Sequence, residues 1–353
     1  MKFIDICSGI GGFRTALEKH GHECVAFAEI DKFAKQSYKA IYDTDNEEEL
    51  NDITTITDEH FRLYRGSVDI ITGGFPCQAF SIAGNRRGFE DTRGTIFFHI
   101  ARAIKEIQPS YVLLENVKGL LSHDKGRTYG TIVQALDELG YFIEWGLFNS
   151  KYWGVPQNRE RVYILVTRKD VWKEPKLFNL VKQQTEVNTK LIDILETDVD
   201  EKYFLSDEKV KKLTLNEDLS GKLNHYDYRD VDSVHSVNKV SPTLNTMQGG
   251  DRQPKVAVPV LTPDRLNKRQ NGRRFKENGE PMFTLTSQDR HGIVTDDIRI
   301  RKLTEKECWR LQGFTDDQFY KAKNAGVSNS QLYKQAGNAV TVNVVDAIVG
   351  AIS

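Results

Sequence analysis

The sequence has few of the residues that build metal sites or disulfide frameworks. Its 353 residues include four cysteines, Cys7, Cys24, Cys77 and Cys308, with no C-x-x-C spacing and no paired histidine cluster. Zinc sites and disulfide frameworks depend on such patterns, so neither is expected and no metal ligand is assigned. Each cysteine is therefore expected either to pack in the core or to act as a reactive thiol.

Long hydrophobic runs and an excess of one charge are also missing. Nowhere do about 18 apolar residues run together, and the opening MKFIDICSGI lacks the basic region and apolar stretch of a secretory signal. We therefore expect a cytoplasmic protein with no membrane partner. Because the formal net charge is −1, a nucleic-acid partner would have to be met by a local basic patch.

Short apolar runs alternate with amphipathic ones over the first 170 residues. Strands are predicted at 2–7, 24–30, 68–74, 110–117 and 161–167, with helices at 13–20, 31–42, 95–107 and 128–140 between them. This β-α-β-α order predicts an α/β fold with a doubly wound sheet that is parallel in large part.

The pattern changes in the second half of the chain. Residues 205–295 are rich in Asn, Gln, Ser, Thr, Gly and Arg, with weak periodicity and short β-like pieces such as 254–261. Strong helical periodicity returns at 303–314 and 338–352, and the latter helix could cover the first sheet. We therefore predict a smaller, mostly β or irregular domain at 205–295, inserted in a larger domain made of 1–204 and 296–353.

A glycine-rich turn follows the first predicted strand, in DICSGIGGF at 5–13. Such a turn lets backbone N–H groups approach a ligand at a helix N-terminus. Glu29 closes the second strand, where a carboxylate can hold two ribose hydroxyls, and Asp52 could meet an adenine edge. Together they favour an adenosine-containing ligand over plain loop carboxylates, and the missing G-x-G-x-x-G argues against NAD.

One cysteine lies in an unusual place, in GGFPCQAFS at 73–81, after the apolar run VDIIT. A structural cysteine normally lies inside an element, whereas Cys77 follows a proline in a loop that glycines make pliable. This position favours a reactive thiol over a small buried hydrophobe.

Six motifs occur in a fixed order along the chain: GFPCQAFS, TRGTIFF, ENV, QNRER, RKLTEKECWRLQGF and GNAV. In this order they resemble the motif series of DNA (cytosine-5) methyltransferases of the bacterial restriction-modification or phage type. The resemblance covers both ends of the chain and leaves out the inserted region. It implies a Rossmann-like methyltransferase domain that uses S-adenosylmethionine and releases S-adenosylhomocysteine, and it makes the insert a target-recognition domain.

The resemblance also implies a catalytic set of four residues. Carbon 5 of cytosine is a poor nucleophile, so a thiolate, here Cys77, first adds to carbon 6. Glu115, while protonated, would hydrogen-bond ring nitrogen 3, although it could instead pair with a nearby arginine. Arg159 and Arg161 would reach the flipped cytosine or its phosphate through their rigid guanidinium groups.

The cofactor site implied by the resemblance gathers residues from both ends of the chain: Cys7, Gly9, Ile10, Gly12, Glu29, Ile30, Asp52, Ile53, Pro76, Ile96, Asn338 and Ala339. Many relatives sandwich the adenine between a phenylalanine and a tryptophan, where this chain has Cys7 and Ile30. We therefore expect weaker stacking on the adenine.

A cytosine inside a duplex must be extruded before chemistry, which favours a loop at 78–94 that closes over the base. Basic residues and amides, which contact phosphates and read base edges, cluster in this loop, at 245–255 and at 265–276. The candidate DNA contacts are Gln78, Ser81, Arg86, Arg87, Arg93, Asn245, Gln248, Arg252, Arg269, Arg273 and Arg274.

Three other functions remain open at this point. A tRNA cytosine-5 methyltransferase would share the fold and methyl donor, but the tripeptide QAF and the long insert count against it. A nicotinamide oxidoreductase lacks its fingerprint, and an inactive DNA-binding relative would not need Cys77 and Glu115. The expected partner is double-stranded DNA, bound by a monomer, with a cognate restriction endonuclease as a product of a neighbouring gene.

Overall fold

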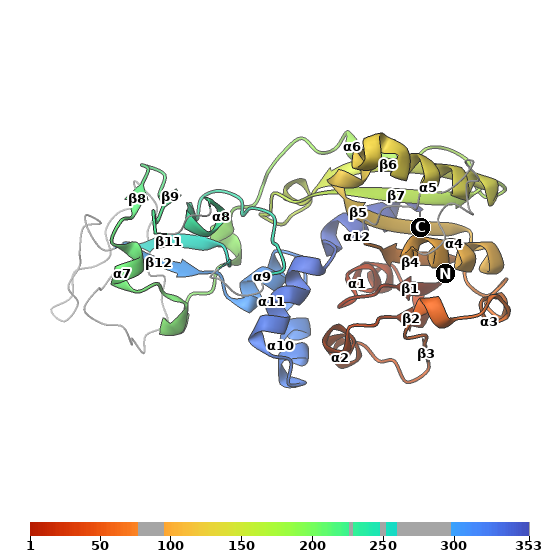
Figure 1. Cartoon of the computed structure of the whole chain (residues 1–353), viewed down its shortest axis with the longest axis horizontal. Coiled ribbons are helices and arrows are strands. Elements are labelled where there is room, and N and C mark those ends of the chain that lie inside the picture. The colour runs from red at the N-terminus through yellow and green to blue at the C-terminus, as the bar shows by residue number, and fades with distance from the viewer. Residues whose placement is uncertain (77–94, 226–228, 248–251, 260–297, 353) are drawn as a thin grey trace.

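The computed structural model describes the chain except residues 77–94, 226–228, 248–251, 260–297 and 353. Within that part, a larger sheet of seven strands and a smaller sheet of five form two lobes (Figure 1). The larger sheet has the order β3-β2-β1-β4-β5-β7-β6, formed by β1 (Lys2–Ile6), β2 (Glu23–Ala28), β3 (Glu48–Glu49), β4 (Ile70–Gly74), β5 (Tyr111–Val117), β6 (Tyr141–Asn149) and β7 (Glu160–Arg168).

Strand direction changes within this sheet. The five strands β3, β2, β1, β4 and β5 are parallel to one another, whereas β7 is antiparallel to both β5 and β6. Because the strands alternate their side chains, β1 directs Phe3 to one core and Ile4 and Ile6 to the other.

Helices cover both faces of the larger sheet. On the face of Ile4 lie α3 (Asp58–Arg62), α4 (Ile96–Ile107) and α5 (Arg127–Glu138). The opposite face is covered by α1 (Gly12–Lys19), α2 (Lys32–Ile41), α6 (Leu177–Val181) and α12 (Val342–Ile352). The predicted doubly wound α/β fold is confirmed.

The helix from the end of the chain completes the core of the first lobe. Val345 and Ile348 of α12 are buried in the cluster that contains Phe3 of β1, and α12 packs beside α1 (Figure 1). An ion pair from Lys19 to Asp346 at 2.6 Å and a hydrogen bond between His20, just after α1, and Asp346 at 2.9 Å join the two helices. The first and last parts of the described chain therefore form one unit.

The strand β6 was not among the strands expected from sequence. Its segment YFIEWGLFN interrupts the apolar run with Glu144 and Gly146, so neither a continuous nor a strictly alternating pattern marks it. Its position next to β7 also explains why the sheet is only partly parallel, because the short turn at 150–159 leaves no room for a crossover helix.

The smaller sheet has the order β12-β11-β10-β9-β8. Its elements are α7 (Asp207–Val210), β8 (Thr214–Leu215), β9 (Gly221–Lys222), α8 (Arg229–Asp232), β10 (Ser233–His235), β11 (Lys255–Pro259) and β12 (Ile298–Lys302). Leu205, Leu223, Val234, Ala257 and Ile300 are buried together there. Beyond β12 lie α9 (Glu305–Arg310), α10 (Asp316–Asn324) and α11 (Asn329–Asn338), next to both lobes in Figure 1.

One stretch of the predicted insert packs with the larger lobe. Val237, Leu244 and Met247 are buried in the same cluster as Phe3 and the residues of α12. Ser241 donates its backbone N–H to the Pro156 carbonyl at 2.7 Å. The boundaries 205 and 295 stay a prediction, and the chain around 241–247 lies against the larger lobe.

Asp5 is a fully buried carboxyl in the middle of β1. It accepts a hydrogen bond from the Thr72 hydroxyl at 2.8 Å and one from Tyr38 at 3.4 Å. Burial raises the pKa of Asp5 to about 7, against these hydrogen bonds and the charge of Arg14, which lower it. The folded protein therefore holds a proton here that the unfolded chain releases near pH 4.

We expect this proton to make stability fall as the pH rises. Between the unfolded and folded pKa values only the native state is protonated, so the free energy of unfolding decreases by up to about 1.4 kcal/mol per pH unit. Relative to Asp5→Asn, the wild type should lose about 3 kcal/mol between pH 5 and pH 8 in urea unfolding. Parallel pH profiles of the two proteins would contradict this, and the exposed Asp45→Asn serves as the control.

Candidate active site

The predicted site residues of the first lobe come together at one edge of the larger sheet. Because β1, β2, β4 and β5 are parallel neighbours, the residues that follow them lie along the same edge. These are Cys7 after β1, Glu29 after β2 and Pro76 after β4, with Glu115 near the end of β5. The edge at the carboxyl ends of the strands is where open α/β sheets bind ligands.

The turn after β1 depends on its glycines. Gly9 and Gly11 have φ values of 57° and 83°, in the left-handed region that favours glycine. A Cβ on Gly11 would lie 2.4 Å from the Tyr42 ring, and one on Gly12 would lie 2.5 Å from a Val340 methyl group. The turn is therefore enclosed from behind by α2 and by the segment after α11.

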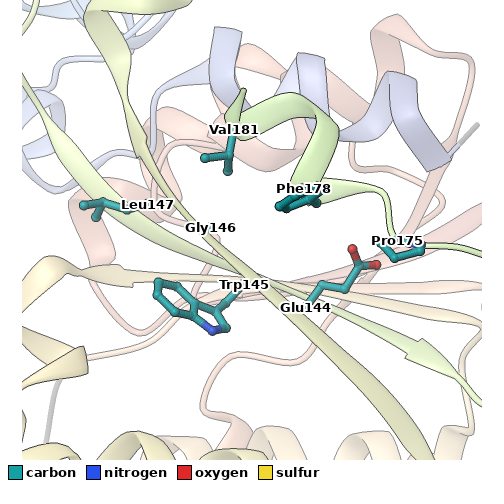
Figure 2. Close-up of a pocket in the computed structure, with 7 residues that line it drawn as sticks. All are labelled: Glu144, Trp145, Gly146, Leu147, Pro175, Phe178 and Val181. Atoms are coloured by element: carbon teal, nitrogen blue, oxygen red, sulfur yellow. The ribbon is translucent and has the colours of Figure 1, made fainter. Parts of the chain in front are cut away.

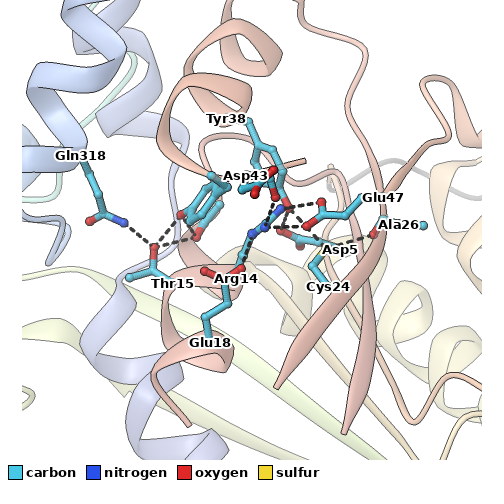
Figure 3. Close-up of polar contacts among 12 residues, drawn as sticks. Asp5, Arg14, Thr15, Glu18, Cys24, Ala26, Tyr38, Asp43, Glu47 and Gln318 are labelled. Atoms are coloured by element: carbon cyan, nitrogen blue, oxygen red, sulfur yellow. Dashed lines mark hydrogen bonds and ion pairs between the residues drawn. The ribbon is translucent and has the colours of Figure 1, made fainter. Parts of the chain in front are cut away.

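A buried polar network holds the back of this turn. Tyr42 donates its hydroxyl hydrogen to the Gly11 carbonyl at 2.8 Å and contacts the Thr15 hydroxyl at 2.6 Å. Arg14 lies over the Tyr42 ring, with 4.3 Å from its guanidinium carbon to the ring centroid, and binds both oxygens of Glu47 (Figure 3). Sequence reasoning missed Arg14 and Tyr42, because their contacts span about thirty residues and no motif marks them.

Two carboxylates frame the turn from the side. Glu29 accepts the backbone N–H groups of Gly9 and Asp31, both at 2.8 Å, so one side chain fixes the turn and the start of α2. Asp52 caps the short 3₁₀ helix η1 (Ile53–Thr55) by accepting the Thr54 N–H at 2.9 Å. Hydrogen bonds from the side chain and the backbone N–H of Thr54 lower the pKa of Asp52, which keeps it ionised.

The remaining cofactor candidates lie around this turn. Ile30, next to Glu29, is 73% exposed and offers an apolar surface without an aromatic ring. Ile53 is buried and Ile96 begins α4. Asn338 is the last residue of α11, and Ala339 follows it, next to Val340. Among the described residues, the buried hydroxyl of Ser8 has no hydrogen-bond partner, and a polar ligand in the turn would supply one.

The three described cysteines are all held as neutral thiols. Burial raises the pKa of Cys7 to about 12, helped by the negative charges of Glu29 and Asp5. Burial also raises the pKa of Cys24 and of Cys308. A thiol is a weak nucleophile, so none of the three is suited to attack a base. The fourth, Cys77, lies outside the described residues.

Glu115 is a buried carboxyl that faces the end of β4. One carboxylate oxygen lies 3.1 Å from Arg161 Nε, and the other lies 3.6 Å from where a Cβ on Gly74 would be. Glycine at position 74 therefore keeps the space in front of Glu115 open. The arginine pairing considered as an alternative from sequence does occur.

Opposing effects act on the proton of Glu115. Burial raises its pKa, while the charges of Arg159 and Arg161 and the hydrogen bond from Arg161 lower it, and burial has the larger effect. A raised pKa lets a carboxylic acid keep its proton closer to neutral pH, as a hydrogen-bond donor requires.

Asn116 fixes the chain that leads to Cys77. Its Nδ2 donates to the Phe75 carbonyl at 2.8 Å, and its Oδ1 accepts the Val117 N–H at 2.9 Å. Phe75 is followed by Pro76, the last described residue before the gap. The motif ENV contained this residue, but sequence reasoning assigned a role only to Glu115.

Arg159 and Arg161 are placed differently. Arg161 lies beside Glu115 and, toward the described residues, uses two of its five N–H donors, on Glu115 and on the Glu160 carbonyl. Arg159 is 2% exposed and donates to the backbone carbonyls of Leu244, Gly337 and Ala339.

Two of the candidate DNA contacts lie within the described residues. Asn245 and Arg252 are exposed, and Asn245 Oδ1 accepts the Met247 N–H at 2.7 Å. The others lie outside the described residues, as Cys77 does: Gln78, Ser81, Arg86, Arg87, Arg93, Gln248, Arg269, Arg273 and Arg274.

A separate pocket lies on the far edge of the larger sheet (Figure 2). Its lining comes from β6 and from residues 175–181, and it is mainly apolar, with Trp145 and Phe178 exposed. None of the predicted site residues lines it.

The described residues contain neither a metal-binding cluster nor a single membrane-spanning helix. No group of three or more His, Cys, Asp or Glu in the described ranges could hold a metal ion. None of the helices that the structure describes is by itself long and apolar enough to cross a bilayer, and α11 and α12 reach that length only as a pair bent by 40°.

Comparisons with known proteins agree over the whole chain. The family profile described as C-5 cytosine-specific DNA methylase matches residues 1–353. Orphan methyltransferase M.SPRI of Bacillus phage SPR is 39% identical, over 99% of this chain and 96% of the relative. Type II methyltransferase M.BanI of Aneurinibacillus aneurinilyticus is 32% identical, over 99% and 95%.

Solved structures show the same fold. The crystal structure of the S. pombe Dnmt2 methyltransferase has a TM-score of 0.67 and 18% identity, covering 99% of this chain and 96% of that one. A putative DNA modification methyltransferase encoded in an E. coli prophage has a TM-score of 0.66 and 16% identity, covering 100% and 98%.

Proposed function

Since the chain belongs to the C-5 cytosine-specific DNA methylase family and is a DNA (cytosine-5)-methyltransferase, we propose that it methylates cytosine within a specific duplex sequence, through a covalent adduct on Cys77. The observation that carries this proposal is the position of Glu115. Glu115 is buried and paired with Arg161. It lies opposite Gly74, the last residue of β4, from which the chain continues to Cys77.

The proposed chemistry begins with addition to the base. The Cys77 thiolate forms a bond to carbon 6 as Glu115 gives its proton to ring nitrogen 3, so the electrons of the ring double bond move towards carbon 5. Arg161, whose remaining donors have no assigned partner within the described chain, would hold the base or its phosphate.

S-adenosylmethionine, which the family uses, would supply the methyl group for carbon 5 and would be converted to S-adenosylhomocysteine. The described residues fit this cofactor, because the open glycine turn and the unpartnered Ser8 hydroxyl face the same edge as Glu29. Loss of the carbon-5 proton to solvent then restores the ring double bond and expels the Cys77 thiolate, while ring nitrogen 3 returns its proton to Glu115.

Glu29 would hold the ribose, while Asp52 and Ile53 would face the adenine. The other contacts proposed are Cys7, Gly9, Ile10, Gly12, Ile30, Pro76, Ile96, Asn338 and Ala339. The Asn116 contact would keep Pro76 and Cys77 at the right distance from Glu115.

The proposal extends to the organisation of the enzyme. Residues 205–295 would be the target-recognition domain, inserted between the catalytic parts 1–204 and 296–353. We propose a cytoplasmic monomer. Relatives named type II methyltransferases match the chain and support a cognate restriction endonuclease encoded nearby, whereas the 39% identical relative of Bacillus phage SPR is named an orphan methyltransferase and supports an enzyme that acts without one.

Transfer of tritiated methyl groups from S-adenosylmethionine tests this function. We expect incorporation into duplex DNA and none into tRNA, and bisulfite sequencing of a randomised duplex library should show methylated cytosines in one short sequence. Replacing 205–295 by the corresponding segment of another such enzyme should change that sequence. Transfer to tRNA alone would exclude the proposal, and an active chimera that kept the parent sequence would place recognition elsewhere.

A further inference from the structure

Arg159 lies in the turn between β6 and β7 and is almost completely buried. Its Nη1 donates to the carbonyls of Leu244 and Gly337, both at 3.2 Å, and its Nη2 donates to the Ala339 carbonyl at 2.8 Å. Leu244 belongs to the segment predicted for recognition, whereas Gly337 and Ala339 flank the cofactor candidate Asn338. One side chain therefore holds both segments.

The two segments also touch directly. A Cβ on Gly337 would lie 2.0 Å from the Asn245 carbonyl oxygen, so only glycine permits this approach. On the other side, Gln157 Oε1 accepts the Leu244 N–H at 3.1 Å, and its Nε2 donates to the Leu311 carbonyl at 2.7 Å. A shift of the chain at 244 would therefore disturb residues 337–339.

Because Arg159 is charged and buried, its stabilisation depends on the positions of the carbonyl groups that it contacts. Arg14 and Arg301 are similarly buried, but each forms an ion pair with a glutamate, Glu47 and Glu307 respectively. Arg159 has no such ion pair within the described part of the chain. Its cation is stabilised by the three carbonyl dipoles and, only while Glu115 is ionised, by the Glu115 carboxylate.

Burial and the neighbouring Arg161 lower the pKa of Arg159 to about 10, so it still carries its charge at neutral pH. A buried cation with few partners loses much stabilisation when one of them moves away. The carbonyls of Leu244 and of the C-terminal end of α11 at 337–339 must therefore keep their positions relative to one another.

We propose that Arg159 is a positioning residue that couples the segment 241–247 to the C-terminal end of α11 at 337–339, which includes the cofactor candidate Asn338, so that DNA and cofactor strengthen each other's binding. The proposal rests on the function proposed above, in that 241–247 responds to bound DNA. It differs from a direct contact between Arg159 and the target cytosine, because its effect on the cofactor does not need the base.

The variant Arg159→Lys tests the coupling, since lysine keeps the charge but cannot reach three carbonyls with a planar fork. We expect S-adenosylhomocysteine to bind about tenfold more weakly without DNA, within the usual range of coupling between sites. The gain in affinity on adding the cognate duplex should shrink towards one. Isothermal titration calorimetry with and without that duplex measures both.

Arg301→Lys is the matched control, because Arg301 is equally buried and lies in the smaller sheet, paired with Glu307. It should lower the Tm while leaving the affinity for S-adenosylhomocysteine within about twofold of the wild type. A second variant, Gly337→Ala, pushes against the Asn245 carbonyl and should weaken the coupling in the same direction.

Hydrogen exchange on the wild type keeps the proposal testable if neither variant folds. Bound S-adenosylhomocysteine should protect amides at 241–247, and bound duplex should protect those at 337–342. Absence of both effects would overturn the coupling.

An Arg159→Lys variant with wild-type cofactor affinity would also overturn the coupling. If the difference in cofactor affinity between this variant and the wild type disappeared on DNA that lacks the target base, Arg159 would be a contact to the base instead. Failure of the wild type to methylate DNA would refute the proposed function itself, whatever Arg159 does.

Discussion

Replacing Cys77 by serine should abolish methyl transfer while DNA and cofactor binding stay measurable. A serine hydroxyl is barely ionised near neutral pH, so addition to carbon 6 should slow by several orders of magnitude. The described cysteines cannot substitute for Cys77, because burial raises the pKa of each of them. The tritiated-methyl assay measures the loss, and Cys24→Ser is the control, expected to retain most of the activity.

A trapped adduct gives an independent test of the same residue. In DNA with 5-fluorocytosine at the target, fluorine cannot leave as a cation, so the bond between protein and base should persist and survive SDS. The adduct should be absent from Cys77→Ser. An adduct in that variant, or substantial turnover by it, would mean that another residue is the nucleophile.

The second large effect is expected for Glu115→Gln. The amide can still donate to ring nitrogen 3 but cannot pass it a proton, so the rate should fall about 10²- to 10⁴-fold. Single-turnover methylation of the cognate duplex is the measurement. Glu160→Gln is the matched control, because Glu160 lies on β7 beside Arg161 and pairs with Lys118 near the surface. A wild-type rate for Glu115→Gln would remove this residue from the mechanism.

The pH dependence of the methylation rate tests whether Glu115 acts through its proton. Burial raises the pKa of Glu115, so the wild-type rate should be lost as the pH rises through that raised value and the proton leaves. In Glu115→Gln the amide hydrogen stays bound, and this decrease should disappear from the profile. A decrease of the same shape in both proteins would assign it to another group.

Much of the first lobe could be predicted because its information is local. Buried parallel strands appear as apolar runs, and the residue that ends each run lies at a known edge of the sheet. For this reason the sequence alone is enough to place Glu29 and Glu115 at one edge. The strand β6 was missed because Glu144 and Gly146 break its pattern, although pairing with β7 stabilises it.

The environment of a side chain could not be predicted in the same way. Arg159 was interpreted as a contact to the base or its phosphate, since arginine usually serves that purpose. Its three acceptors lie 85, 178 and 180 residues away along the chain, so only the folded structure brings them together. Asn116 lies beside Glu115 in sequence, yet its partner is the Phe75 carbonyl on the neighbouring chain segment.

Because α12 packs against α1, the core of the larger lobe can be completed only late in the synthesis of residues 1–353. Residues 1–170 leave the ribosome before residues 342–352, so the part of the sheet face around Phe3 that α12 covers stays exposed until α12 has been synthesised. Val340, which closes the glycine turn behind Gly12, emerges just before them. The nascent chain therefore exposes this apolar surface until α12 has emerged, and the glycine turn is closed only after Val340 has been added.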